Sequence, residues 1–416
     1  MIRKSVLIVF TLMIFHVKAQ EEFKSIDKLI DVGRYHTALT ELKSLSPTFK
    51  SSYKIAILYD AIDNHKEAAN YFKQALTFKD DYKTKVKLGK SLRKDKKITE
   101  AIHVYEDILK TDPENLLVKY ALSKMYLQKG EAKKAKGLLQ KLIKEDQNNA
   151  NFHYQLGIAN TALGKKYKRV DNFLDAYNVD AQHFNAIEKL ARAFTKLRDK
   201  DSASIFINKG LALRPNHLNL NKLKINRLFL DKKYNESLLL LKNLDSIAPN
   251  EHYTNSMLGK TYLKLEQYDN AKKHFHKATK INNEDFKSYI YLGEIYLKQK
   301  EIKSAMYNFA MGSYMGKEKR DKAHTGLAKV YLEMKLPNRA IEEYKIAVTE
   351  NANNYKALYE LAKLSDNYYK DKKIGLRLYK RYLDRFENKV PEIDAFVKKR
   401  IKEIKKSYFL KGEIVE

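Results

Sequence analysis

Residues 252–285 read HYTNSMLGKTYLKLEQYDNAKKHFHKATKINNED, and residues 286–319 read FKSYIYLGEIYLKQKEIKSAMYNFAMGSYMGKEK. Aligned without a gap, the two stretches share Leu-Gly at positions seven and eight, tyrosine at eleven, alanine at twenty and phenylalanine at twenty-four. Self-similarity at a fixed period is typical of a repeat architecture, in which each unit buries its apolar face against its neighbours. This 34-residue period therefore decides the fold.

The same period extends along the chain in both directions. Leu156-Gly157 precedes Leu258-Gly259 by three periods, and filling the gaps places repeats near residues 49, 82, 116, 150, 184, 218, 252, 286, 321 and 355. A degenerate repeat near residue 20 brings the number to eleven. Only 14 glycines and 6 prolines occur in 416 residues, which favours helices over a turn-rich β architecture.

Each period carries two small residues, at positions eight and twenty. Position eight holds Ala56, Gly89, Ser123, Gly157, Ala191, Gly259, Gly293, Ala328 and Ala362. Ile225 is an exception at position eight, and Arg169 replaces the small residue at position twenty. Small residues let antiparallel helices approach closely. We expect the bulky residue at position eleven to pack against the aromatic residue or leucine at twenty-four.

Glycine and proline mark the ends of the predicted helices. Gly33, Gly130 and Gly164 fall between paired helices, where a left-handed C-cap suits glycine. Three prolines fall at position thirty-two and end the second helix, namely Pro113, Pro215 and Pro249. Pro391 opens a last helix to about Ser407, which we expect to cover the apolar face of the final pair.

This pattern resembles the tetratricopeptide-repeat family over residues 22 to 385. The resemblance implies an all-α fold, a right-handed superhelical solenoid of about eleven helical hairpins with a C-terminal capping helix. We expect the solenoid to occupy residues 20–390, with the capping helix and a short tail in residues 391–416.

Residues 1–19 fit the pattern of a secretory signal peptide. A basic start, Met1 to Lys4, precedes an apolar run, and Val17 and Ala19 provide the small residues of a cleavage site. The run is about half the ~20 residues that cross a bilayer as a helix. We expect cleavage after about Ala19 and export of a bacterial chain to the periplasm or beyond. The alternatives are an uncleaved anchor and a cytoplasmic start.

The composition excludes several classes of function. No cysteine is present, so disulfides, thiolate metal sites and a cysteine nucleophile are ruled out. The formal net charge is +30, from 81 basic and 51 acidic side chains, and lysine outnumbers arginine 67 to 14. Base-specific readers of nucleic acid depend on the bidentate fork of arginine, so sequence-specific nucleic-acid binding is disfavoured.

Motifs of enzymes and cofactor sites are weak or incomplete. Gly89-Lys90-Ser91 and Gly259-Lys260-Thr261 imitate the end of a phosphate-binding loop but lack its upstream glycine. His274 and His276 are two residues apart on a helix, so they point to different faces and cannot chelate one metal ion. Glu342 and Glu343 suit a solvated helix face. We expect no enzyme activity, no catalytic residue, no cofactor and no metal site.

In the family that the chain resembles, the first helices line a concave groove that binds partners. Position nine should face this groove, and it holds Ile57, Lys90, Lys124, Ile158, Arg192, Asn226, Lys260, Glu294, Lys329 and Lys363. Position two adds further lysines, namely Lys83, Lys287, Lys322 and Lys356. Six of the ten residues at position nine are basic, although any surface position of a lysine-rich helix will often be lysine.

Some members of the family clamp a C-terminal carboxylate with five residues of three successive first helices. Lys222, Asn226 and Lys287 match this clamp, whereas Met257 and Tyr291 do not. The candidate partner-binding residues are therefore Lys90, Lys124, Arg192, Lys222, Asn226, Lys260, Lys287, Lys329 and Lys363. Tyrosine recurs at position five, as Tyr53, Tyr120, Tyr154 and Tyr359, either for recognition or for packing between first helices.

These observations predict a non-enzymatic scaffold that binds a partner polypeptide in its groove, and the lysines of the groove suit an acidic partner. The export signal suggests a role in assembling a bacterial envelope or surface complex. The alternative is sequence-independent binding of a polyanion, an acidic glycan or nucleic acid, which would show steep salt dependence.

Overall fold

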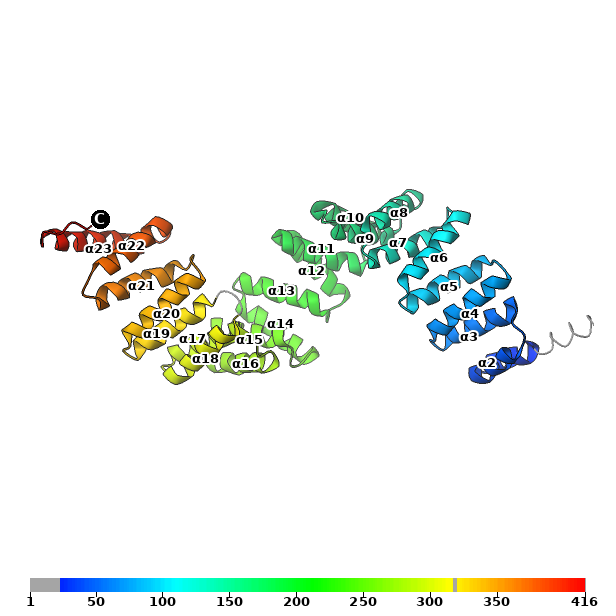
Figure 1. The fold of residues 1–416 in the computed structure, drawn as a ribbon, viewed down its shortest axis with the longest axis horizontal. Helices are drawn as coiled ribbons and strands as arrows, with labels where there is room; N and C mark the ends of the chain where they lie inside the picture. Colours follow the sequence, from blue (N-terminus) through cyan, green and yellow to red (C-terminus); the bar gives the residue numbers. More distant parts are fainter. Residues whose placement is uncertain (1–22, 317–319, 416) are drawn as a thin grey trace, which may run out of the picture. The chain divides into compact units, whose positions relative to one another are not determined.

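The computed structural model describes residues 23–316 and 320–415, so the expected signal segment, residues 1–19, lies outside the described residues. Within these ranges the chain consists of α-helices joined by short turns and contains no strand (Figure 1). The fold is all-α, as expected. Packing divides it into two compact units, one ending at Leu213 and the other beginning at Arg214. The repeat pattern does not reveal this division, because the period continues across it.

The first unit contains helical residues 23–31 and eleven labelled helices. These are α2 (Tyr35–Ser44), α3 (Phe49–Ala61), α4 (His65–Phe78), α5 (Tyr82–Lys94), α6 (Ile98–Thr111), α7 (Leu116–Gln128), α8 (Ala132–Glu145), α9 (Ala150–Ala162), α10 (Lys166–Val179), α11 (Phe184–Leu197) and α12 (Lys200–Leu213).

The second unit contains eleven labelled helices. These are α13 (Leu218–Leu230), α14 (Tyr234–Ile247), α15 (His252–Lys264), α16 (Tyr268–Ile281), α17 (Phe286–Lys298), α18 (Ile302–Met315), α19 (Asp321–Glu333), α20 (Pro337–Glu350), α21 (Tyr355–Tyr368), α22 (Lys373–Phe386) and α23 (Pro391–Phe409). In each unit consecutive helices contact one another, so paired hairpins stack into a solenoid (Figure 1).

The first helix of each hairpin from α3 to α21 begins at the residue where the repeat pattern starts. A polar side chain just before most of these helices accepts a hydrogen bond from a backbone N–H of the first turn. The capping residues are Thr48, Asp81, Asn115, Asn149, His183, His217, Asp285 and Asn354. Such caps satisfy N–H groups that the helix leaves unpaired, so they define where each hairpin begins.

The turns inside the hairpins share one left-handed residue. Gly33, Gly130 and Gly164 have φ of 77°, 82° and 69°, which confirms the predicted C-caps. Seven other hairpins place a larger side chain in the same conformation, with φ between 58° and 63°, namely Asp63, Lys96, Arg198, Lys232, Glu266, Lys300 and Lys335. Side chains other than glycine adopt this conformation at a cost.

The glycines at position eight make room for an aromatic ring of the second helix. A Cβ added to Gly89, Gly259 or Gly293 would come within 2.7, 2.6 or 2.8 Å of the ring at position twenty-four. The exception, Ile225, is fully buried in the same cluster as Leu241, which occupies position twenty-four of that hairpin. A larger residue at eight is therefore accompanied by a non-aromatic one at twenty-four.

The ring at position eleven packs differently from the prediction. Tyr59 stacks on Tyr71, Phe194 on Phe206, and Tyr262 on His274, with ring centroids 5.5–5.6 Å apart. Each partner is at position twenty-three rather than twenty-four. The side chain at position twenty-four packs against position eight. The ring at position eleven therefore contacts the side chain at position twenty-three of the second helix.

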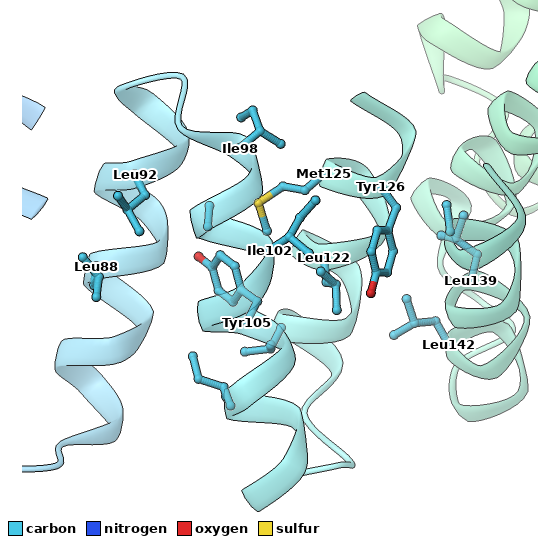
Figure 2. Packing of buried hydrophobic residues seen from close by; sticks show 14 of the residues in the cluster. Leu88, Leu92, Ile98, Ile102, Tyr105, Leu122, Met125, Tyr126, Leu139 and Leu142 are labelled. Carbon is cyan, nitrogen blue, oxygen red and sulfur yellow. The ribbon is translucent and has the colours of Figure 1, made fainter. Parts of the chain in front are cut away.

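The hydrophobic core continues from one hairpin to the next within a unit. Figure 2 shows one section of it, in which Tyr105 of α6 and Tyr126 of α7 lie among leucine, isoleucine and methionine side chains of α5 to α8. Tyr120 of α7 packs on Phe152 of α9 with ring centroids 5.2 Å apart. The tyrosine at position five therefore joins successive first helices in this part of the stack.

The capping helix α23 covers the last hairpin. Val397 and Ile404 are buried in one cluster with side chains of α21 and α22. Asp366 of α21, 3% exposed at its side chain, accepts hydrogen bonds from Arg400 of α23 at 2.7 Å to Nε and 3.2 Å to Nη2. A Cβ added to Gly375 of α22 would come within 2.7 Å of the Cβ of Asp366, so this position of α22 has no room for a side chain.

No helix in the described part of the chain is both long enough and apolar enough to cross a membrane.

Candidate functional site

The first helices of the second unit surround two adjoining cavities of about 820 and 890 Å³. We call them together the inner hollow. Both cavities are lined by Glu294, Asp321, Lys322 and Asn351. The first is also lined by Lys260, Glu284, Phe286, Lys287, Ile290, Tyr291 and Met315. The second extends to Lys298, Lys329, Tyr355, Lys356, Tyr359, Glu360 and Ile393, among others.

The lining side chains lie on one face of each first helix because of their spacing in the sequence. Lys322, Thr325 and Lys329 of α19 all line the second cavity and are three and four residues apart, so they share one face of the helix. These are positions two, five and nine of the repeat. The same positions of α15, α17 and α21 supply other members of the lining, which builds the inner hollow from one repeated face.

The inner hollow carries an excess of positive charge. Lys260, Lys287, Lys322, Lys329 and Lys356 line it, and none of them forms an ion pair with another residue in the described ranges. Some lysines of the second helices, by contrast, form ion pairs. Lys272 of α16, for example, pairs with Asp269 at 3.2 Å and with Glu301 at 3.6 Å.

Two of these lysines lie near aromatic rings. The Nζ of Lys260 lies 5.9 Å from the ring centroid of Tyr291, and that of Lys287 lies 5.7 Å from Phe286. A cation over a ring is attracted by the negative face of the π-system. Burial lowers the pKa of Lys260, because the surrounding protein replaces part of the water around its ammonium group.

Glu294 is one of the two carboxylates that line both cavities, and Asp321 is the other. Its side chain still reaches water, but protein atoms surround it, and removal from bulk water raises the pKa of its carboxyl. Lys329, Lys322 and Lys264 act in the opposite direction and favour the ionised form. The lining of the inner hollow therefore combines six lysines with four carboxylates, namely Glu284, Glu294, Asp321 and Glu360, which leaves a modest excess of positive charge.

Two of the three residues that match a carboxylate clamp already have partners within the chain. Lys222 donates to the carboxylate of Glu251, and Tyr253 donates to Asn226 Oδ1 at 2.9 Å. Lys222 and Asn226 belong to α13 and do not line the two cavities. Of the three matching residues, Lys287 alone lines the inner hollow.

Sequence comparison identifies the repeat. Two family models, both described as tetratricopeptide repeat, match this chain, one over residues 92–156 and the other over residues 49–82 and 253–285. The chain contains tetratricopeptide repeats over these residues. Repeats of this kind typically serve as scaffolds for protein–protein interactions and are generally not catalytic.

Solved structures with similar arrangements come from diverse organisms. Yeast Tom70 is 11% identical, with 94% of this chain and 97% of that one covered, at a TM-score of 0.44. A tetratricopeptide repeat protein from Parabacteroides merdae is 16% identical, with coverage of 63% and 98%, also at 0.44. Pseudomonas aeruginosa pilF is 16% identical, with coverage of 52% and 98%, again at 0.44. Likeness of this degree carries no information about partners.

The remaining candidate residues lie outside the two cavities. Lys90, Lys124 and Arg192 are exposed on α5, α7 and α11 of the first unit. Arg192 lies 3.4 Å from Glu188. Lys363 is exposed on α21. The structure therefore brings Lys260, Lys287 and Lys329 together and places the other six candidates elsewhere.

One constellation has the order of a hydrolase triad. Ser313 Oγ lies 2.9 Å from His324 Nε2, and His324 Nδ1 lies 2.6 Å from Glu343 Oε2. Ser313 occupies the last turn of α18, where the helix dipole is negative and would disfavour an oxyanion. Neither Ser313 nor His324 lines the inner hollow. We interpret the three as a polar bridge between α18, α19 and α20.

The two histidines of α16 have separate partners. His274 Nδ1 lies 3.0 Å from Asn255 Oδ1, and His276 Nε2 lies 2.9 Å from the hydroxyl of Tyr296. Burial lowers the pKa of both imidazoles. In residues 23–316 and 320–415, no group of three or more His, Asp or Glu side chains is arranged to hold a metal ion.

Sequence reasoning missed the apolar part of the inner hollow. Phe286 and Ile290 of α17, Met315 of α18, Tyr355 of α21 and Ile393 of α23 all line it. Positions one and five of the first helices were available signals for the residues of α17 and α21. Ile393 had no such signal, because α23 lies outside the repeat.

Proposed function

We propose that this protein holds an acidic segment of a partner polypeptide in the inner hollow. The observation that carries the proposal is the set of five lysines, Lys260, Lys287, Lys322, Lys329 and Lys356, that line one hollow without an ion pair to another described residue. Exposed lysine–carboxylate contacts contribute only ~0.2–1 kcal/mol each, so affinity would come from several contacts along the hollow.

The test uses charge reversal on matched faces of the second unit. One variant replaces Lys287, Lys322, Lys329 and Lys356 by glutamate. The control replaces four exposed lysines of second helices, Lys273, Lys277, Lys303 and Lys345, by glutamate, which changes the net charge equally. Binding of a fluorescein-labelled decapeptide of glutamate is followed by fluorescence anisotropy at several salt concentrations. We expect the hollow variant to lose binding and the control to retain it.

The same experiment separates the polyanion alternative. If the two variants lose affinity equally, the attraction comes from overall charge and the proposed site is wrong. If heparin and single-stranded DNA bind the inner hollow as tightly as the peptide, with an equally steep salt dependence, sequence-independent polyanion binding replaces the proposal.

We further propose that the chain is exported and acts in assembling a bacterial envelope or surface complex. The support is the composition of residues 1–19, with its basic start, apolar run and small residues before position 20. The mass of the chain isolated from its source cells tests this proposal. A mature chain beginning near residue 20 supports export, and a retained Met1 contradicts cleavage.

A further inference from the structure

A partly exposed aromatic ring lies near the end of the inner hollow where α23 meets α21. Tyr359 of α21 and Ile393 of α23 line the cavity of about 890 Å³. Phe396 of α23 stands edge-on to Tyr359, with ring centroids 5.9 Å apart, and is 40% exposed. An aromatic ring that remains open to water beside a cavity favours burial by a partner side chain.

The aromatic rings near α15 and α17 already contact other side chains of the protein, so they are less available to a partner. Tyr291 stacks on Phe275 with ring centroids 5.1 Å apart, and Lys260 lies over its ring. Phe286 has Lys287 at 5.7 Å. Ile290 is 5% exposed. Near α23, Lys389 lies 4.8 Å from the ring centroid of Tyr355, but among the described residues no lysine lies over Tyr359 or Phe396.

We propose that the acidic segment carries one aromatic or large aliphatic side chain, which is buried against Tyr359, Ile393 and Phe396. This inference rests on the proposed function and adds the chemistry of the partner. It assigns the capping helix α23 a part in recognition, since Ile393 comes from outside the repeats.

Helix spacing sets the length of the segment. The first helices α15, α17 and α19 contact one another in succession, and packed helix axes lie about 8–10 Å apart. An extended chain advances about 3.3 Å per residue, so it passes one hairpin in about three residues. A segment that spans α15 to α21 is therefore about ten residues long. Its acidic residues recur about every third position, and the apolar residue follows at the end near α21.

The test compares two fluorescein-labelled decapeptides on the full chain. Both carry glutamate at positions one, four and seven, with glycine and serine between them. One ends in phenylalanine and the other in serine, and both are amidated so that no terminal carboxylate contributes. We expect the phenylalanine peptide to bind about tenfold or more tightly, which is the effect of burying one aromatic side chain.

Matched variants locate the effect. Ile393→Ser should remove the preference for phenylalanine while the serine peptide binds as before. Ile414→Ser is the control, because Ile414 is 88% exposed and outside the hollow. It should leave the preference intact. Lys322→Glu should weaken both peptides to a similar degree.

Photocrosslinking tests the location without any substitution in the protein. A peptide with benzoylphenylalanine in the last position should attach to residues 355–359 and 389–397. Equal binding of the two peptides, or attachment mainly near α15, would overturn the inference and leave the acidic site standing. Failure of both peptides and of the glutamate decapeptide would instead reject the proposed function.

Discussion

The ring of Phe275 in α16 lies against Gly259 in α15, where an added Cβ would come within 2.6 Å of ring atom Cδ1. Phe275 is fully buried. The contact therefore requires that position eight of this hairpin carry no side chain, and the same relation holds between Gly293 and Phe309. Glycine is retained in the middle of these helices, despite its low helix propensity, because the ring occupies the space of a methyl group.

We expect Gly259→Ala to lower the free energy of unfolding by about 1–2 kcal/mol. Overpacking a core costs about 1–3 kcal/mol, and the better helix propensity of alanine offsets up to about 1 kcal/mol of that. Urea denaturation measures the loss, and amide hydrogen exchange should place it in α15 and α16. Replacing the ring by a smaller side chain, with Phe275→Leu added to the Gly259→Ala variant, should recover part of the lost stability.

Gly137→Ala is the matched control. Gly137 lies inside α8, and a Cβ added there meets no atom within 4 Å. Alanine should therefore stabilise this helix by about 0.5–1 kcal/mol. If Gly137→Ala and Gly259→Ala change stability in the same direction, ring packing is not what distinguishes the two glycines.

Lys232→Gly should stabilise the second unit by about 0.5–1 kcal/mol. Lys232 has φ of 61° in the turn between α13 and α14, a conformation that costs a residue with a Cβ about 1–2 kcal/mol. Glycine removes that cost but adds freedom to the unfolded chain, which reduces the net gain. Thermal unfolding measures the change. Lys242→Gly, inside α14, should instead destabilise by about 1 kcal/mol.

The register of the hairpins could be predicted from the sequence because one period of 34 residues recurs ten times. An exception within one repeat, such as Ile225 at position eight, does not shift the register, because the repeats on both sides keep the period. The inner hollow could be predicted only in part. Lys260, Lys287 and Lys329 follow from their repeat positions, whereas the pairing of Lys222 with Glu251 depends on which carboxylate happens to be within reach. The contribution of Ile393 depends on how α23 docks, and no repeat predicts that.

Arg400→Met should destabilise the C-terminal end by about 2–3 kcal/mol. Arg400 is the bidentate partner of Asp366, and its removal leaves this buried carboxylate, among the described residues, with only the long contacts from Tyr379 at 3.4 Å and Lys372 at 4.0 Å. Hydrogen exchange in α23 should rise first, because this pair joins α23 to α21. Glu403→Gln is the control. Glu403 is an exposed partner of Arg400 at 2.9 Å, and its loss should cost less than about 1 kcal/mol.

Glu294→Gln should raise stability near neutral pH and have little effect in acid. Burial raises the pKa of Glu294 in the folded protein, so the folded state binds this proton more tightly than the unfolded chain does. By linkage, the ionised carboxylate lowers stability above the folded pKa, and that loss disappears as the pH falls below the unfolded pKa. Thermal unfolding of the variant and the natural chain should therefore differ most at pH 7 and converge below about pH 4.

Glu342→Gln provides the comparison for this experiment. Glu342 is an exposed carboxylate of α20 that lies 3.5 Å from Arg339, so its neutralisation should give no gain at pH 7. A gain of equal size in both variants would mean that any loss of negative charge is stabilising. We do not expect that result, because removing a carboxylate from a chain of net charge +30 adds to the repulsion among its positive charges. A gain confined to Glu294→Gln would show that the position of this carboxylate in the inner hollow, rather than the overall charge, makes its ionised form costly.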